Sequence, residues 1–396
     1  MGKKYLRGDQ ISIFCIMFFA VVAGLALYQE DSSFYNSSVS NTIRIIMYVL
    51  AAVMCVSVWH KLKKVNIGFF IPVLYWIYTI FNAYTNPTIN LLNTITLILV
   101  FLVSFKAEID ILLIYRKWII LISILGIIGY LFYIFHIGFP YEVTHYYSNR
   151  IVANYIDYKF TYIFSSGMSL RLCGLFNEPG FFGTVLALLL CADRLNPKHV
   201  GNWIMLIAGA MTFSAAFIII ISFYLVLNSI KSVKILILVI IALIFYFYIL
   251  PNMTFNNPNI NTLVQRITWI NGGFFGDNRS NNIIDEAFAE LWKTKYILFG
   301  HGGGYCASLI TGGVASVKTY VIDYGIMGVL VIYGTLIAYS IRKCHKNWQS
   351  LSYVFVFVLS IYQRPNIYSP IYFILLLYGI DYINNNYVLK ENRLKI

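Results

Sequence analysis

Apolar runs close to the length of a membrane helix recur along most of the chain, and they constrain its fold more than any other feature. A helix needs roughly 20 apolar residues to cross the hydrocarbon layer of a bilayer. Lipid cannot satisfy bare backbone groups, so apolar runs without strand-like alternation are expected to be helices. The chain is 59% hydrophobic and 11% charged over 396 residues. The sequence therefore predicts an all-α polytopic membrane protein, a single integral membrane domain over 1–396.

Twelve apolar segments are candidate membrane spans. The seventh and eighth are separated by Thr212-Phe213-Ser214, whose hydroxyls interrupt the apolar run, and they are open to a second reading as one long helix. The twelve segments cover about residues 11–28, 43–59, 67–83, 89–105, 117–138, 179–192, 202–213, 215–230, 234–250, 318–341, 350–363 and 368–384.

Basic residues favour two helices over 202–230, since Lys and Arg concentrate on the cytoplasmic side of membrane proteins. With twelve spans and the N-terminus inside, the expected inner segments hold 19 of the 29 Lys and Arg residues. We therefore expect both termini in the cytoplasm and two large outer loops, over about 139–178 and 251–317. The net charge of +13 lies in short clusters between apolar runs, which argues against a groove for nucleic acid.

A charged decapeptide stands at the mouth of one predicted helix, from Arg171 through Glu178 and Pro179 to Gly180. Charge at a membrane boundary is costly and often functional. Pro at the first helical position and an acid before it suit a helix start, which explains Glu178 structurally. Glu178 is equally a candidate carboxylate that orients an arginine or accepts a proton from a sugar hydroxyl. Arg171 has no such local explanation.

The second dense motif is a glycine turn, Gly300-His301-Gly302-Gly303-Gly304. Its glycines let the backbone approach a ligand closely, and its N–H groups suit an anion. No Gly-Lys-Ser/Thr follows, so it is not a Walker A loop. His301 is a candidate base or phosphate ligand, although a histidine in such a turn more often makes a loop hydrogen bond.

Further expectations concern a helix, an acid within an apolar run, metal sites and the cysteines. Apolar spacing predicts a helix within Ile283–Leu298, and Asp323, inside a late apolar run, is expected to be paired. Neither the acids nor the six cysteines have metal-ligand or Cys-x-x-Cys spacing. We expect no metal and no cofactor, and we interpret the cysteines as packing residues.

Taken in order, these motifs resemble the O-antigen polymerase (Wzy-type) family, within the wider class of O-antigen polymerases and ligases. The resemblance covers about Arg150 to Leu330, and the N-terminal third matches in hydropathy alone. It is carried by Arg-x-x-Gly-x-Phe-x-Glu-Pro-Gly at 171–180, Thr-Phe-Ser at 212–214, a long loop with arginines, Phe-Gly-His-Gly-Gly-Gly at 299–304 and Gly-Ile-Met-Gly at 325–328.

The resemblance implies a glycosyltransferase-C-like membrane fold in the bacterial inner (cytoplasmic) membrane. It implies metal-independent polymerisation of undecaprenyl-pyrophosphate-linked oligosaccharide repeat units into O-antigen or capsular polysaccharide on the outer face. Membrane lipids would surround such an enzyme, and a chain-length regulator protein is a candidate partner. Arginines of the two outer loops would hold the donor pyrophosphate, which here are Arg150, Arg171, Arg266 and Arg279.

Two departures and one alternative class bear on this interpretation. The ligase branch carries a His-Asn pair before its late Gly-x-x-Gly span, whereas no His lies between Gly302 and Cys344 here. The arginine that usually follows the Thr-Phe-Ser break is replaced by Ala215. A ligase that transfers glycan to lipid A-core stays a runner-up. A flippase or transporter predicts charges within many spans, and few occur, Asp323 and Arg44 among them.

Overall fold

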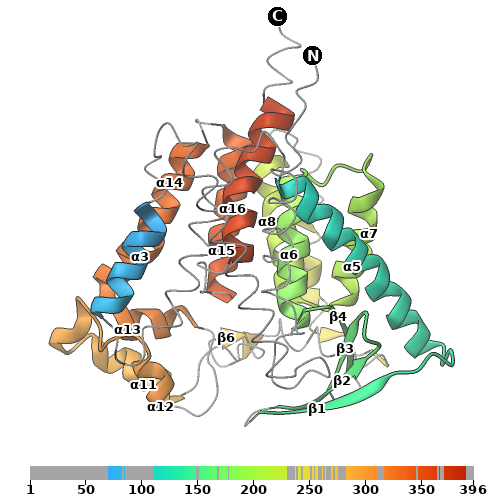
Figure 1. The fold of residues 1–396 in the computed structure, drawn as a ribbon, viewed down its shortest axis with the longest axis horizontal. Coiled ribbons are helices and arrows are strands. Elements are labelled where there is room, and N and C mark those ends of the chain that lie inside the picture. The colour runs from blue at the N-terminus through green and yellow to red at the C-terminus, as the bar shows by residue number, and fades with distance from the viewer. Residues whose placement is uncertain are drawn as a thin grey trace, which may run out of the picture.

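The computed structural model shows a mostly helical protein with a small antiparallel sheet (Figure 1). It describes residues 70–82, 84, 111–148, 151–166, 169–176, 178–229, 282–309, 316–344, 347–363, 365 and 370–388, with short pieces between 237 and 274. The α-helices in these ranges are α3 (Phe70–Phe81), α5 (Ile111–Ile134), α6 (Pro179–Ala192), α7 (Val200–Met211), α8 (Ala215–Ser229), α11 (Asn282–Leu291), α12 (Tyr305–Leu309), α13 (Val317–Val329), α14 (Thr335–Lys343), α15 (Trp348–Gln363) and α16 (Pro370–Ile383).

Four strands follow α5 as a simple meander. They are β1 (Glu142–Ser148), β2 (Ile151–Asp157), β3 (Tyr162–Ser166) and β4 (Ser169–Gly174), in the order β1-β2-β3-β4 with antiparallel neighbours. Aromatic and β-branched residues with short connections favour such hairpins. The last strand, β4, packs against α5 and α6, and the hydroxyl of Tyr130 on α5 donates to the Leu170 carbonyl at 3.1 Å. Trp269–Ile270 and Gly273–Phe274 form a further short pair.

Helix α6 lies at the centre of the main hydrophobic core. Every side chain from Phe182 to Ala192 is buried, and the segment is apolar all round, as expected of a helix with no solvent-facing side. Helices α7, α8, α15 and α16 pack against it, and α5 packs against α7 and α16. The side chains of α16 from Ile371 to Ile380 are buried in the same way.

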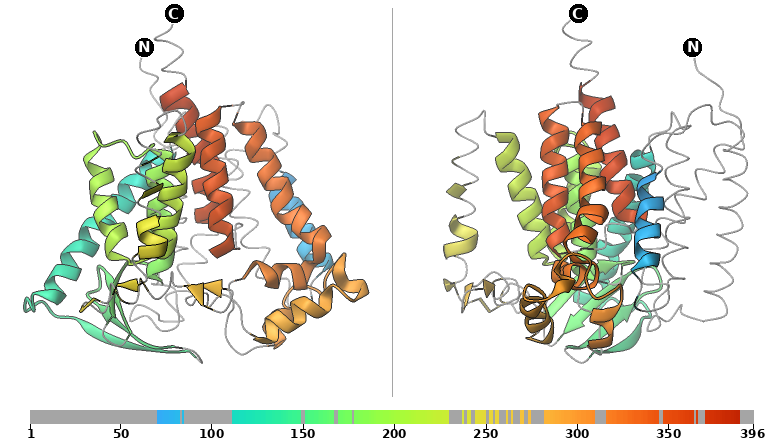
Figure 2. Two further views of the ribbon diagram at one scale, coloured as in Figure 1. Left: turned by 180° about the vertical axis from the view of Figure 1, so that it is seen from behind. Right: turned by 90° about the vertical axis from the view of Figure 1, so that its left-hand side faces the viewer.

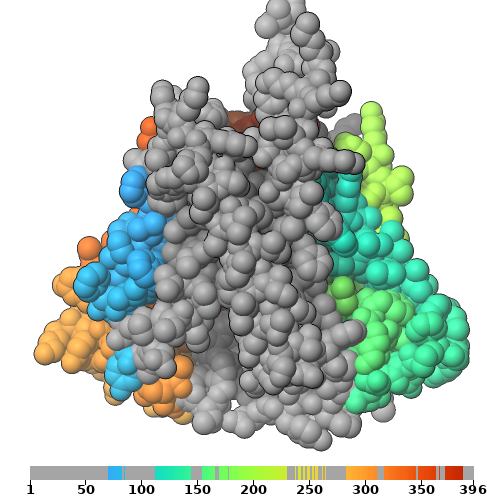
Figure 3. Space-filling view, viewed as in Figure 1, coloured from blue at the N-terminus to red at the C-terminus, as the bar shows by residue number. Residues whose placement is uncertain are grey.

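The sheet and the short helices α11 and α12 gather at one end of the longer helices. Both views in Figure 2 place β1–β4 with α11 and α12 at this end, which we call the sheet end. Helix α6 begins at the sheet end and finishes at the other, where the α6–α7 connection lies (Figure 1). In Figure 3, α3 and the elements near α11 occupy one flank, and α5 occupies the other. The sheet and the α11–α12 region, which are the parts described of two segments far apart in sequence, therefore lie at the same end.

The predicted fold class, an all-α protein with about twelve spans and a glycosyltransferase-C-like arrangement, is wrong. Within the described ranges, two helical stretches are long and apolar enough to cross a membrane, Leu112–Ile134 and Val317–Lys343. Helices such as α6, α7 and α8 have 12 to 15 residues, about 18–22 Å at 1.5 Å per residue. A hydrocarbon layer is about 30 Å thick. The expected loop over 139–178 is also not irregular, because it holds the sheet.

Several helix positions do agree with the apolar pattern. Helix α6 occupies 179–192, and the stretch 202–230 is divided at Thr212–Ser214 into α7 and α8. The helix expected within Ile283–Leu298 is α11. The segments expected at 11–28, 43–59 and 89–105 lie outside the described residues.

Candidate functional site

Three of the six predicted site residues lie in the described part of the chain, and all three are at the sheet end. Arg171 is on β4, Glu178 immediately precedes α6, and His301 lies between α11 and α12. The other three predicted residues, Arg150, Arg266 and Arg279, lie outside the described residues.

Arg171 is a buried cation that connects the sheet to a helix break. Its side chain leaves β4 and reaches the end of α7, where Nε donates to the Thr212 carbonyl at 2.9 Å and Nη2 donates to the Phe213 carbonyl at 3.2 Å. Only 4% of the residue is exposed. Carbonyls at a helix C-terminus lack helical partners and carry the negative end of the helix dipole, so a guanidinium is a favourable partner there.

The break that Arg171 contacts is itself closely packed. Phe213 adopts a left-handed conformation with φ of 46°, and the Thr212 hydroxyl donates to the Gly209 carbonyl at 2.6 Å. Helix α6 passes close by through Gly183, where an added Cβ would lie 2.8 Å from Ser214 Cβ. The Thr-Phe-Ser motif therefore ends one helix and starts the next, and the arginine motif stabilises that junction.

Glu178 occupies the position before the first turn of α6 and is half-buried. Its backbone is extended, its carbonyl accepts from the N–H groups of Phe181 and Phe182, and its carboxylate makes no capping hydrogen bond. Pro179 is the first helical residue, as the sequence predicted. The helix start is thus explained by Pro179 and the Glu178 backbone, which leaves the carboxylate without a role in capping.

His301 is held in an aromatic stack. Its imidazole centroid lies 4.3 Å from the Tyr296 ring and 4.4 Å from the Tyr305 ring, with interplanar angles of 30° and 17°. Two rings cannot share one face at these distances, so the tyrosines cover both faces of the imidazole. Its backbone N–H donates to the Ile322 carbonyl at 2.9 Å. The edge of the ring is therefore the part that can meet a ligand.

The N–H groups around the glycine turn already bind a carboxylate of the protein. Asp323 Oδ2 accepts from Gly304 N at 3.0 Å, and Oδ1 accepts from Cys306 N at 2.9 Å. The predicted anion nest is thus occupied by Asp323. The expectation that this acid is paired is also met, by backbone N–H groups.

A close backbone approach docks the turn onto α13. Gly325 has φ of 66° inside that helix, and an added Cβ would lie 2.4 Å from the Leu298 carbonyl carbon. The Met327 N–H donates to the Leu298 carbonyl at 3.0 Å. On the other side, Gly303 N donates to the Asn82 carbonyl at the end of α3. The Gly-His-Gly-Gly-Gly and Gly-Ile-Met-Gly motifs therefore form one packed unit with α3.

The sheet carries its own buried acid, Asp157. Its Oδ1 accepts from the backbone N–H of Lys159 at 2.6 Å, and the Lys159 ammonium lies 3.6 Å from Oδ2. Burial raises the pKa of the Asp157 carboxyl, and the Lys159 hydrogen bond and charge oppose the rise. Burial also raises the pKa of the Cys173 thiol on β4, with Arg171 opposing the rise and Glu178 adding to it. Cys173 is fully buried and packs beside Tyr162.

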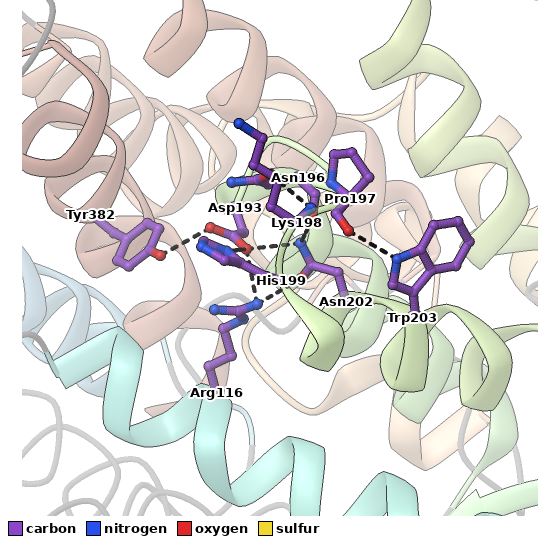
Figure 4. Close-up of polar contacts among 9 residues, drawn as sticks. All are labelled: Arg116, Asp193, Asn196, Pro197, Lys198, His199, Asn202, Trp203 and Tyr382. Carbon is purple, nitrogen blue, oxygen red and sulfur yellow. Dashed lines mark hydrogen bonds and ion pairs between the residues drawn. The ribbon is translucent and has the colours of Figure 1, made fainter.

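A polar cluster at the end opposite the sheet has no counterpart in the predictions. Asp193 is fully buried where α6 ends, and Figure 4 shows the side chains that converge on it. Oδ2 lies 2.9 Å from Arg116 Nη2, 2.6 Å from His199 Nδ1 and 2.8 Å from Asn202 Nδ2, and Oδ1 accepts from the Tyr382 hydroxyl at 2.9 Å. This network joins α5, α6, α7 and α16.

The available signal for that cluster was the acid directly after the apolar run 179–192. A buried acid beside an apolar helix needs a partner, but Arg116 counted only among the basic residues of the expected inner segments, and His199 carried no prediction. Both carboxylate oxygens of Asp193 contact side chains of other helices, and His199 at the edge of the cluster is half-exposed. The cluster therefore holds the helices together.

The structure brings Arg171 and Glu178 to the mouth of α6 and places His301 in a separate unit at the same end. No group of three or more His, Cys, Asp or Glu residues suited to a metal occurs in the described ranges. Comparison with protein-family models, with curated proteins and with solved structures finds no match for this chain.

Proposed function

We propose that the protein is a membrane-bound glycosyltransferase that polymerises undecaprenyl-pyrophosphate-linked oligosaccharide repeat units. One observation supports this most: Arg171, Glu178 and His301 lie at a single end of a helical protein whose longest helices are apolar (Figure 1). A lipid-linked substrate needs its lipid in the bilayer and its pyrophosphate and sugar at the surface. Polar groups at one end of apolar helices suit that division.

In this reaction the hydroxyl of an acceptor repeat unit attacks the anomeric carbon of the donor glycan. The bond from that carbon to the pyrophosphate oxygen breaks, and undecaprenyl pyrophosphate leaves with the bonding electrons. The acceptor hydroxyl gives up its proton to a base. Cationic side chains near the departing oxygens offset the charge that develops there, which is an electrostatic form of catalysis.

Glu178 and Arg171 are assigned by their surroundings. Glu178 is the candidate base, because it is half-buried at the mouth of α6, on the same end as Arg171 and His301. Arg266, Arg279 and Arg150 lie outside the described residues, and they are candidate pyrophosphate ligands because of the sequence resemblance to O-antigen polymerases. Arg171 donates two hydrogen bonds inside the protein, so we assign it to positioning the mouth of α6, and direct contact with pyrophosphate stays a prediction. His301 is a second candidate base.

The test is an assay with purified full-length protein in lipid nanodiscs. The substrate is a repeat unit on undecaprenyl pyrophosphate, extracted from cells that lack this protein. A ladder of longer lipid-linked chains supports the proposal. Glu178→Gln should reduce the ladder strongly, whereas Glu286→Gln, an exposed acid on α11, is the matched control and should leave it unchanged.

Two other results would replace the proposal. Glycan that appears on lipid A-core, without longer lipid-linked chains, would identify a ligase. Movement of the lipid-linked unit across inverted vesicles, without a new glycosidic bond, would identify a flippase.

A further inference from the structure

Large apolar side chains are exposed in one short segment at the sheet end, from Trp292 to Phe299. Trp292 is 52% exposed, Tyr296 41%, Leu298 51% and Phe299 55%. A run of this kind is unusual on a surface that meets only water, because a contiguous apolar patch normally marks an interaction site.

The segment is well anchored from beneath. The preceding helix α11 turns Ile284 and Leu291 into a small core with Cys306 and Ile322, and all four are buried. The Thr294 hydroxyl accepts from Tyr296 N at 3.3 Å and donates to the Leu291 carbonyl at 3.0 Å. The apolar side chains are therefore displayed on a folded support.

Charge along the segment is of one sign. Lys293 and Lys295 are both exposed, and residues 292–299 contain no acid. The nearby acids, Asp285, Glu286 and Glu290, all precede the segment on α11. Exposed lysines between large apolar side chains suit an anionic surface that also accepts apolar groups.

The segment continues onto the exposed face of a candidate membrane span. The Leu298 carbonyl accepts from the Met327 N–H at 3.0 Å, which places the segment against α13. Met327 and Leu330 are 41% and 56% exposed within the apolar stretch Val317–Lys343. Apolar surface thus runs from the segment onto that stretch.

We propose that Trp292–Phe299 is an interfacial segment that docks on an anionic lipid bilayer. Tryptophan and tyrosine favour the headgroup level, where their rings meet apolar and polar groups together. Lysine keeps its ammonium among the headgroups while its alkyl chain covers apolar surface. Residues 292–299 would then set the depth at which the sheet end lies in the membrane surface.

The experiment measures the depth of spin labels on the full chain in vesicles of phosphatidylcholine and phosphatidylglycerol. Labels are attached at Leu298→Cys and Phe299→Cys, with Glu286→Cys as the exposed control on α11. Cys15 and Cys55 are replaced by serine, and Cys173, Cys191, Cys306 and Cys344 are buried. Collisions with oxygen report apolar surroundings, and collisions with a water-soluble nickel chelate report water.

We expect the ratio of oxygen to nickel collisions to be several-fold higher at 298 and 299 than at 286. Equal ratios at the three positions would overturn the proposal. Low collision rates with both reagents at 298 and 299 would place the segment against protein and would also overturn the proposal. Broadening of the spectra by neighbouring labels would identify that protein as a second copy of the chain. The measurement uses no glycan substrate, so its outcome is independent of the proposed enzymatic activity.

Discussion

The guanidinium of Arg171 reaches from β4 to the junction of α7 and α8, where Nε donates a hydrogen bond to the Thr212 carbonyl at 2.9 Å. This contact joins two motifs that are 41 residues apart in sequence. It also explains why an arginine stands before the Glu-Pro-Gly helix start. The cation is part of the packing at the mouth of α6.

Arg171→Ala should destabilise the protein. The change removes the two hydrogen bonds that the guanidinium donates to the carbonyls of Thr212 and Phe213. One hydrogen bond from a charged group contributes about 1.5–3 kcal/mol. Arg171→Lys should recover part of this loss, because an ammonium can reach one carbonyl but lacks the planar fork. Denaturant unfolding in detergent measures both. The control Arg342→Ala, at an exposed position on α14, should cost less than about 1 kcal/mol. An Arg171→Ala protein as stable as the parent would contradict this role.

Asp193 and Arg116 should be strongly coupled. Asp193→Ala removes the carboxylate partner of the buried Arg116 guanidinium, which keeps its hydrogen bond to the neutral Asn202 amide, and breaking a buried pair costs about 3–5 kcal/mol. Arg116→Met together with Asp193→Ala should cost less than the sum of the single changes. A double-mutant cycle on the free energy of unfolding checks this, with an expected coupling of about 0.5–3 kcal/mol. Strict additivity of the two changes would show that the pair does not interact.

Gly325→Ala should disrupt the docking of the glycine turn. Its φ of 66° strains any residue with a Cβ, and that atom would lie 2.4 Å from the Leu298 backbone. Gly334→Ala is the matched control, since its Cβ would meet nothing closer than 3.9 Å and alanine favours helix by roughly 1 kcal/mol. The midpoint of thermal unfolding of Gly334→Ala should therefore equal or exceed that of the parent, and the midpoint of Gly325→Ala should be clearly lower. The reverse order would refute the close approach.

Asp157 should give the free energy of unfolding a specific pH dependence. Burial raises the pKa of its carboxyl in the folded protein above the ordinary value that applies in the unfolded chain. Between these two pKa values the folded state binds more protons than the unfolded state, so the free energy of unfolding decreases as the pH rises. Asp157→Asn cannot titrate, and its slope in this window should be flatter than that of the parent. Glu286→Gln, at an exposed position, should keep the parental slope. Equal slopes in the parent and Asp157→Asn would exclude this origin.

Helix positions could be predicted from local signals that are strong in this chain. Pro179 starts α6, and polar Asp193 and Arg194 follow its last apolar residue, so both ends are marked in the sequence. The α7–α8 junction was predicted because Thr212 and Ser214 interrupt an apolar run and the distribution of basic residues favours two helices there. Hydropathy also overestimated the number of membrane spans, because a short apolar helix can be buried inside the protein as completely as α6 is.

The sheet was missed for a physical reason. Lipid cannot satisfy strand edges, but this restriction holds only inside the hydrocarbon layer, and β1–β4 lie at the end of the helices (Figure 1). Their own signals were present, since β1 and β2 are separated by only two residues and are rich in aromatic and β-branched side chains.

The candidate site was predictable by motif but not by contact. Sequence identified Arg171 and the glycine turn as polar features of an apolar chain. The sequence did not indicate that Arg171 would donate to the Thr212 carbonyl, or that the glycine turn would bind the Asp323 carboxylate. Such partners lie 41 and 19 residues away and are found only in the folded protein.

The central claim, that arginines of the outer segments bind a lipid-linked pyrophosphate, is tested most directly by the affinity of undecaprenyl pyrophosphate for the nanodisc-embedded protein. Arg266→Ala should raise its Kd about tenfold or more, because a hydrogen bond to a charged group contributes about 1.5–3 kcal/mol and each 1.4 kcal/mol is tenfold. Arg342→Ala, which changes an exposed arginine on α14, should leave the Kd unchanged. Parental affinity in Arg266→Ala, or an equal loss in Arg342→Ala, would contradict the claim.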